Sequence, residues 1–340
     1  MRKSKNKTKN SHNHEKGGPG SPSGAKQMEQ KTAFGGIELK NPLTASSSPL
    51  TESPERIERC AKAGFGSAIL KTASPYHRAQ AGYGRKVVFI GEDYFADASF
   101  QREILTEEEG LALYRKAQAH KGDMLLIPSV SASSLEAADW LGICRKFQAM
   151  GAKLLQLDFF YLGSVICGQN EDFYLDLEQL LSRLRQELDC LIMPKLNFGL
   201  DPELACRALA KAKVRQVSLL DSIRFPLPAR FGLHPETTSY FGPKQLPLTL
   251  LYLQHAVNYE LEVCAGGGIA KAADADLLLE NGAKLVQTAS YVLKNGFSKA
   301  PLLLHKEPIP MESHRRTWCD ARHYGAEGCE RCGFCLGVPK

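Results

Sequence analysis

Short apolar runs alternate with longer amphipathic stretches along most of this chain. Eight of the runs are typical of buried strands: one ends near Ser46, and the others cover residues 67–72, 124–130, 153–160, 190–196, 216–221, 261–265 and 285–288. Residues 34–39 form a further short hairpin pattern. Strands that alternate with helices at this spacing are typical of parallel βαβ units. We therefore predict an α/β fold, a (β/α)8 TIM barrel, over residues 32–304.

Capping residues mark the starts of several predicted helices. Ser-Pro and Asp-Pro pairs suit an N-cap followed by proline at the first helical position, and Ser or Thr three residues before Glu suits a capping box. The first helix should end near Ala63, the helix after the third strand near Gly151, and the next should cover 176–188. The connection 76–104 is longer than a simple loop in a compact domain, so we expect it to have a role of its own. The caps are Ser53-Pro54, Thr106 with Glu109, Ser133 with Glu136, and Asp201-Pro202.

Composition separates the two ends of the chain from the predicted barrel. Residues 1–31 hold eight Lys or Arg and two Asp or Glu, so this segment carries the whole net charge of +6. It has no apolar run, so we expect a disordered, solvated basic tail, with contact to RNA or acidic surfaces as the alternative. Because the charge belongs to this tail, it does not indicate nucleic-acid binding by the fold. No run is long enough to span a membrane, and we expect a cytoplasmic protein. The sequence leaves the oligomeric state open, including a homodimer.

Glycines and small residues follow the last two predicted strands. Gly266 to Gly268 end one strand, and Ala289-Ser290 follow the other at the start of a helix. Glycine lets a ligand approach the backbone, and free amides at a helix start bind phosphate. Loops after strands 7 and 8 of such barrels commonly form a phosphate site. The alternative is a glycine turn that only lets helix and strand pack.

Polar side chains stand where several predicted strands end. A barrel places its chemistry at that face. A lysine at the end of a buried strand is costly unless it meets an anion or a ligand, and this chain has two. The alternative is that each lysine extends to solvent. The strand-end residues are Ser46, Lys71, Asp158, Lys195 and Asp221.

Short motifs in the same order resemble the FMN barrel of dihydroorotate dehydrogenases and of the pyrimidine-binding half of dihydropyrimidine dehydrogenases. The resemblance covers about residues 32–300. It rests on Asn41-Pro42 with Ala45-Ser46, Ile69 to Thr72, Pro194-Lys195-Leu196, Gly242-Pro243 with Pro247, Gly267-Gly268-Ile269, Gln287 to Ser290, and Lys294-Asn295-Gly296.

The resemblance implies a flavoprotein oxidoreductase acting on a CH–CH bond, or reducing a C=C bond, of a pyrimidine-like substrate. Lys71 and Lys195 would stabilise negative charge on the reduced flavin. The FMN-binding residues that it implies are Ala45, Ser46, Lys71, Asp158, Lys195, Asp221, Gly242, Gly267, Gly268, Ala289 and Ser290.

The expected substrate site departs from the family pattern. The position of the family's catalytic base falls on Tyr161, and Cys167 is the alternative; with Lys71 these are the predicted catalytic residues. Substrate-binding positions fall on Asp158, Asp221 and Ser222. Carboxylates only accept hydrogen bonds and repel an anion. We therefore expect poor activity on dihydroorotate.

Four cysteines cluster at the C-terminus, in residues 305–340. Cys329, Cys332 and Cys335 have the spacing of bacterial ferredoxin clusters, and Cys319 is a candidate fourth ligand. The segment resembles the first half of the ferredoxin tail of dihydropyrimidine dehydrogenase. It predicts a 4Fe–4S cluster, with a zinc site as the alternative, and an electron-transfer partner protein. Most of the other six cysteines are interpreted as small core residues.

Two other classes of function remain open from the sequence. One is a binding or assembly protein that keeps the barrel, with or without flavin, but has no turnover. The other is a flavin-free barrel that acts on a phosphorylated metabolite through the phosphate loops alone. The colour of the purified protein would separate them: yellow for flavin, brown with a cluster, and neither for a flavin-free barrel.

Overall fold

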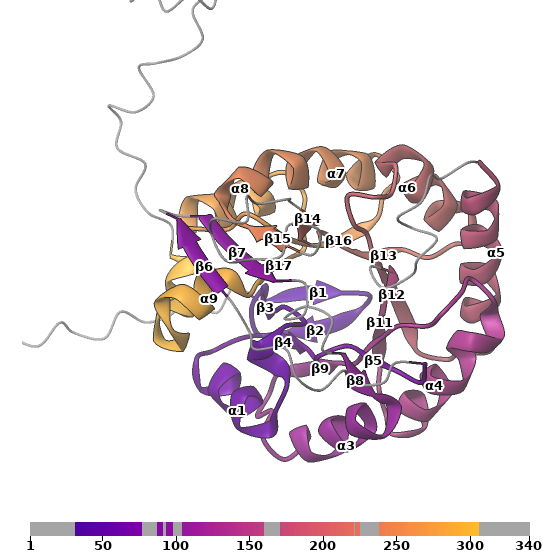
Figure 1. The fold of residues 1–340 in the computed structure, drawn as a ribbon, viewed down its shortest axis with the longest axis horizontal. Helices are drawn as coiled ribbons and strands as arrows, with labels where there is room; N and C mark the ends of the chain where they lie inside the picture. The colour runs from indigo at the N-terminus through magenta and orange to yellow at the C-terminus, as the bar shows by residue number, and fades with distance from the viewer. Residues whose placement is uncertain are drawn as a thin grey trace, which may run out of the picture.

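A computed structural model describes residues 31–76, 87–90, 93–97, 104–159, 171–220, 222–224 and 238–305. Within these residues the chain forms a curled parallel sheet with helices on its outer side (Figure 1). This confirms the predicted α/β class and gives a TIM-barrel-like arrangement. Most of the two predicted tails, residues 1–30 and 306–340, lies outside the described residues.

The parallel sheet has the order β8-β5-β10-β11-β12-β13-β16-β17-β3-β4-β9 in the described part of the chain. Every neighbouring pair in it is parallel. Its strands are β3 (Leu43–Ala45), β4 (Ser67–Ile69), β5 (Ala73–Ser74), β8 (Leu105–Thr106), β9 (Leu125–Ile127), β10 (Ser129–Val130), β11 (Leu154–Asp158), β12 (Leu191–Lys195), β13 (Gln216–Ser218), β16 (Glu262–Gly266) and β17 (Leu285–Thr288).

The strands at the two ends of this sheet order are nearly continuous in the chain: β4 leads into β5, and β9 leads into β10. Only three residues separate β4 from β5, and only Pro128 separates β9 from β10. β9 pairs with β4, whereas β10 pairs with both β5 and β11. The Leu70 amide also donates to the Ile127 carbonyl at 2.9 Å. The sheet therefore curls round on itself, and each predicted strand lies beside its neighbour in chain order.

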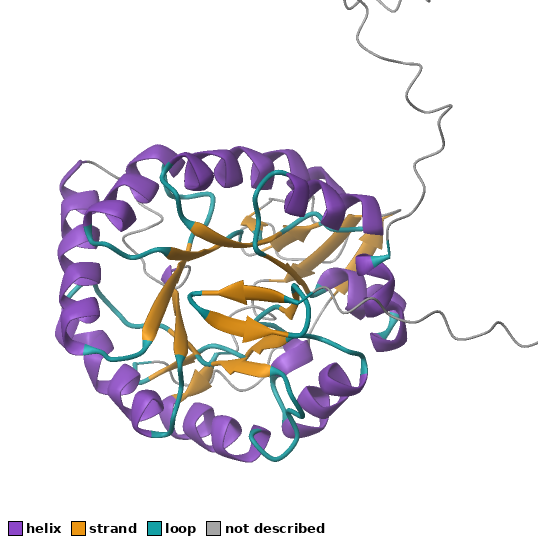
Figure 2. Ribbon diagram, turned by 180° about the vertical axis from the view of Figure 1, so that it is seen from behind, coloured by secondary structure: helices purple, strands orange, loops and turns teal. Residues whose placement is uncertain are grey.

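Helices surround the sheet, as both ribbon views show (Figures 1 and 2). Their ends follow the predicted caps: Ser53 accepts from the Arg56 amide, Asp201 from the Leu204 amide, and Thr106 with Glu109 forms a capping box. The α-helices are α1 (Pro54–Lys62), α3 (Glu107–Ala117), α4 (Ala137–Ala149), α5 (Glu171–Glu187), α6 (Pro202–Lys211), α7 (Leu246–Asn258), α8 (Ala272–Glu280) and α9 (Ser290–Asn295), and the 3-10 helices are η1 (Pro49–Thr51), η5 (Pro243–Gln245) and η6 (Phe297–Leu304).

Two predicted helix starts are wrong. The capping box over 133–136 does not form: α4 begins after Glu136, which makes no side-chain cap. The Ser133 hydroxyl instead donates to Asp139 Oδ2 at 3.1 Å, and the Glu136 amide donates to the Ser134 hydroxyl at 3.0 Å. α5 begins at Glu171 rather than near residue 176. Its first turn carries Glu171 and Asp172, which favour a helix N-terminus.

A short hairpin lies at the N-terminal end of the parallel strands. β1 (Thr32–Phe34) and β2 (Ile37–Leu39) pair antiparallel, which confirms the predicted hairpin. Gly35 and Gly36 have φ of 59° and 74°, values that favour glycine in a tight turn. The Gly35 amide donates to the Glu262 carboxylate at 2.6 Å. Phe34 is completely buried against apolar side chains from β4, β9, β11, β12, β16 and β17, so the hairpin closes this end of the core.

A second, antiparallel sheet was not predicted. It has the order β14-β15-β7-β6, with strands β6 (Val87–Ile90), β7 (Asp93–Asp97), β14 (Ile223–Arg224) and β15 (Thr238–Phe241). β7 pairs with β15, which lies more than 140 residues away in the sequence. The long connection 76–104 thus contributes two strands, which pair with each other, and β15 from the 223–241 region pairs with the outer edge of β7.

The five cysteines of the described residues are all free thiols. Burial raises the pKa of Cys264 to about 12 and that of Cys206 to about 12, so these thiols stay protonated at neutral pH. This agrees with the interpretation of the scattered cysteines as small core residues. In the same part of the chain no helix is long and apolar enough to cross a membrane.

Candidate functional site

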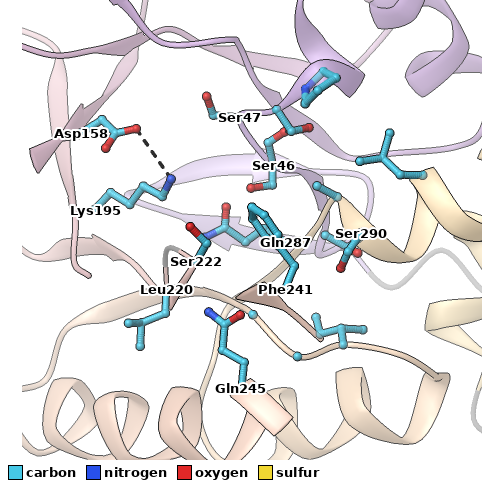
Figure 3. Close-up of a pocket in the computed structure, with 18 of the residues that line it drawn as sticks. Ser46, Ser47, Asp158, Lys195, Leu220, Ser222, Phe241, Gln245, Gln287 and Ser290 are labelled. Carbon is cyan, nitrogen blue, oxygen red and sulfur yellow. Dashed lines mark hydrogen bonds and ion pairs between the residues drawn. The ribbon is translucent and has the colours of Figure 1, made fainter. Parts of the chain in front are cut away.

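A cleft opens at the C-terminal ends of the parallel strands (Figure 3). It contains about 880 Å³ of space not filled by protein atoms, part of which is continuous with solvent. The lining residues are Ser46, Ser47, Ser48, Pro49, Lys71, Asp158, Lys195, Leu220, Ser222, Phe241, Gln245, Gly267, Gly268, Ile269, Gln287, Thr288, Ala289, Ser290 and Leu293.

Tertiary structure brings most of the predicted site residues that it describes to this one cleft. They come from the ends of strands that are distant in sequence but adjacent in the sheet. The predicted residues that line it are Ser46, Lys71, Asp158, Lys195, Ser222, Gly267, Gly268, Ala289 and Ser290.

Other predicted residues do not contribute to the lining that the structure describes. Ala45 is buried in β3, one residue before the lining begins. Gly242 packs beside the Tyr240 hydroxyl instead. Asp221, Tyr161 and Cys167, together with the cluster cysteines Cys319, Cys329, Cys332 and Cys335, lie outside the described residues. Their roles stay predictions.

Two lysines are buried in the wall of the cleft. Lys71 is 7% exposed and Lys195 is 6% exposed. The Lys195 ammonium lies 3.6 Å from Asp158 Oδ2, and Figure 3 shows this pair inside the cleft. A buried ammonium is strongly disfavoured unless counter-charges or hydrogen bonds compensate it. The burial of both lysines disagrees with the alternative that they extend into solvent.

Asp158 is held by hydroxyl groups as well as by Lys195. It is 1% exposed, and its Oδ2 accepts from the Thr72 hydroxyl at 3.0 Å. Because Thr72 has a single hydroxyl hydrogen, Ser129 at 2.9 Å and Ser47 at 3.1 Å must donate to it. The Gln156 amide donates in turn to Ser129 at 2.9 Å. The hydroxyls thus form a chain of hydrogen bonds whose last donor, Thr72, donates to the Asp158 carboxylate. A hydrogen bond accepted by a carboxylate stabilises its ionised form.

The opposite wall is built from small residues. Gly267 and Gly268 have φ of 99° and 91°, which favour glycine. A Cβ on Gly268 would collide with the Leu246 backbone nitrogen, and one on Gly267 would lie 2.7 Å from Gln245 Nε2. Packing therefore explains why these residues are glycines. Their position in the cleft beside Ala289 and Ser290 additionally gives a small, backbone-lined cradle there.

Two glutamines of the cleft were not assigned to the site from the sequence. The Gln287 amide donates to Ser218 Oγ at 2.8 Å and to the Leu219 carbonyl at 2.5 Å, and its Oε1 has no hydrogen-bond partner among the described residues. Gln245 is 1% exposed beside Gly267. Gln287 nevertheless belongs to the motif Gln287 to Ser290, which carries part of the family resemblance. Gln245 belongs to no motif in the sequence analysis. It lies at the end of η5, and only the fold brings this 3-10 helix to the cleft.

One part of the lining is apolar. Leu220, Phe241, Ile269 and Leu293 contribute side chains to the cleft. Phe241 ends β15 of the antiparallel sheet, so this sheet supplies part of the wall. The cleft therefore combines a cationic region, a small-residue cradle and an apolar surface.

No family model matches the chain, and no curated protein matches it. The geometry of the cleft is therefore the basis of the functional assignment below.

Proposed function

We propose that this protein is an FMN-dependent oxidoreductase of the dihydroorotate dehydrogenase-like type, built on a (β/α)8 barrel. It would act on a CH–CH bond, or reduce a C=C bond, of a pyrimidine-like substrate. The observation that carries the proposal is the convergence of Lys71, Lys195 and the small-residue cradle in one cleft. The sequence analysis placed each of these features at the end of a different strand. An extended anionic cofactor has to contact all of them at once, which requires that they share one cleft.

The residues of the cleft suit FMN by their chemistry. The cradle of Gly267, Gly268, Ala289 and Ser290 offers backbone surface and a hydroxyl for the phosphate. The two lysines offer positive charge for a ring that gains electrons. The apolar lining suits a planar ring system.

Side chains of the cleft would bind and orient the flavin and the substrate, and would stabilise negative charge on the flavin ring. Lys71 and Lys195 would hold positive charge in a site of low solvent exposure, where charge stabilisation is strongest. Ser46 and Ser222 would hold polar atoms of the ligands. FMN, when bound, supplies the hydride acceptor. Tyr161 or Cys167 would exchange the substrate proton, and both remain predictions from the sequence.

The test of the proposal is the spectrum of protein purified without oxygen. We expect about one FMN per chain, released on denaturation and identified by its mass. Flavin-free protein that also fails to bind added FMN would overturn the proposal. If such protein bound inorganic phosphate at the cradle, a phosphorylated metabolite would replace FMN as the ligand. A flavin-loaded protein without turnover would favour the binding or assembly function.

We predict that the C-terminal cysteines hold one 4Fe–4S cluster, through which electrons would pass to a partner protein. Anaerobic protein should contain about four iron and four sulfide per chain. Cys332→Ala should lose the iron and retain the flavin, since the cysteine segment follows the last described strand and helix. Cys206→Ala, at a buried α6 cysteine, is the control and should retain the iron. Stoichiometric zinc without iron would identify a structural metal site instead.

We predict slow turnover of dihydroorotate. Tyr161 at the expected base position has a reference pKa of about 10, so it is a poor base at neutral pH. The check is a steady-state assay with an artificial electron acceptor, run beside Tyr161→Phe and Asp221→Asn. Fast wild-type turnover that neither variant changes would contradict the prediction. It would also indicate that Cys167 or another residue supplies the base.

A further inference from the structure

The antiparallel sheet reaches the cleft through one short segment. Residues 240–245, which we call the link, carry the chain from the end of β15 through η5. Phe241 and Gln245 lie on the link and line the cleft, and Figure 3 shows both among the residues around it. The position of the link therefore decides the shape of this part of the wall.

Asp93, the first residue of β7, holds the link from the neighbouring strand. Its Oδ1 accepts a hydrogen bond from the Tyr240 hydroxyl at 2.7 Å, and its Oδ2 accepts one from the Lys244 ammonium. The Tyr240 oxygen in turn accepts from the Lys244 backbone amide at 3.1 Å. Tyr240 is buried, and its ring centroid lies 5.2 Å from that of Phe95. Two residues of the link are thus tied to each other and to one carboxylate.

The protonation states of this cluster suit these bonds at neutral pH. Burial opposes ionisation of Asp93, but the hydrogen bonds from Lys244 and Tyr240 outweigh it, and the pKa of this carboxyl is lowered. Burial, together with the hydrogen bond to Asp93, raises the pKa of the Tyr240 hydroxyl. The carboxylate is therefore ionised and accepts, and the phenol keeps the proton that it donates.

Gly242 leaves the room that this contact needs. A Cβ at this position would lie 2.5 Å from Tyr240 Oη and 3.1 Å from Asp93 Oδ1. Any side chain there would press against the hydroxyl and the carboxylate together. The resemblance to FMN barrels implied that Gly242 binds the cofactor, whereas the structure accounts for this glycine by the contact between Tyr240 and Asp93.

We propose that Asp93 is a positioning residue that holds the link, and with it Phe241 and Gln245, in the wall of the cleft. Asp93 is not part of the described lining, so it acts through Tyr240 on residues that are. The length of the connection 76–104 predicts a role for this segment, and β7 gives it one. An apolar and a polar contact are thereby fixed before a ligand binds, which lowers the cost of ordering them on binding.

The test measures hydrogen exchange of the link in full-length protein without a ligand. Asp93→Ala removes both contacts and should raise exchange of the Lys244 and Gln245 amides at least about fivefold, because local opening becomes easier. Asp93→Asn is the conservative variant, since its side-chain oxygen can still accept from Tyr240. The partner that it loses, the Lys244 side chain, is 77% exposed. Exposed ion pairs contribute little, so exchange should stay within about twofold of wild type.

A second variant covers the case in which Asp93→Ala does not fold. Tyr240→Phe keeps the ring that packs against Phe95 and removes only the hydroxyl. It should also raise exchange about fivefold. The double variant should exceed either single variant by less than about twofold, because all three lose the same hydrogen bond. Unchanged exchange in Tyr240→Phe, or in a folded Asp93→Ala, would overturn the proposal. Independent effects that multiply in the double variant would also overturn it.

Asp123→Ala is the matched control. It removes an aspartate that is paired with a lysine, Lys40, just before β9 and at the opposite end of the strands from the cleft. Exchange of the link should stay within about twofold of wild type, because distant sites act independently. Asp93→Asn that loosens the link as much as Asp93→Ala would contradict the role of the Tyr240 hydrogen bond.

The inference rests on the proposed function only for the identity of the ligand, FMN. Titration of the same variants with FMN should show about fivefold lower affinity in Asp93→Ala and Tyr240→Phe, because the wall must then be ordered on binding. Wild-type affinity in variants whose link exchanges faster would overturn the role of Asp93 in preparing the cleft. Wild-type protein that binds no FMN, together with faster exchange in the variants, would contradict the proposed function alone.

Discussion

Ser290→Asp should lower the affinity for FMN at least about 100-fold while leaving the affinity for riboflavin within about threefold. Ser290 is half-buried at the start of α9 and lines the cradle beside Gly268. A carboxylate there would meet the FMN phosphate, and two like charges about 4 Å apart near a protein surface repel by several kcal/mol. Riboflavin has no phosphate and would not sense the new charge. Fluorescence titration of cofactor-free protein with both ligands measures the difference.

Ser290→Asn is the matched control, because it has nearly the same shape as the aspartate and no charge. We expect it to retain FMN affinity within about threefold. The variants should fold equally well, since an acidic residue in the first turn of a helix is favourable. Equal loss of FMN and riboflavin would place the phosphate elsewhere. Unchanged FMN affinity in folded Ser290→Asp would remove the phosphate assignment of this cradle.

Lys71→Met should retain FMN but shift its reduction equilibrium about 100-fold toward the oxidised form. For a two-electron couple this is a fall of about 60 mV in midpoint potential. The reason is that Lys71 supplies positive charge in the wall of the cleft, whereas methionine keeps only an unbranched apolar chain. Equilibration with redox dyes measures the potential without a known substrate.

Lys153→Met is the control for this measurement. Lys153 is exposed and precedes β11, at the opposite end of the strands from the cleft. It is separated from the flavin by the packed interior, and we expect a change below about 5 mV, a small fraction of a tenfold shift. A potential that stays unchanged in Lys71→Met would exclude Lys71 from the flavin environment.

The alternation of apolar runs and amphipathic stretches was enough to predict the parallel sheet and its helices. Apolar periodicity reports burial directly, because a strand covered on both faces must be apolar throughout. Local chemistry likewise determined several helix starts, such as Ser53 and Asp201, where one side chain caps a nearby amide. Residues 133–136 show the limit of this reasoning. There the Ser133 hydroxyl donates to the charged carboxylate of Asp139, and α4 begins after Glu136 instead.

The sequence by itself determined which residues are candidates for the chemistry of this protein: two lysines at strand ends, glycines after a strand, and hydroxyls beside them. Only the tertiary structure decided what each of them faces. Asp158 and Lys195 are 37 positions apart in the sequence, and sheet register makes them neighbours. The pairing of β7 with β15, which places Phe241 in the cleft, depends on contacts across 140 residues. Such long-range contacts leave little periodic trace, because each strand is short and its partner is fixed by the fold around it.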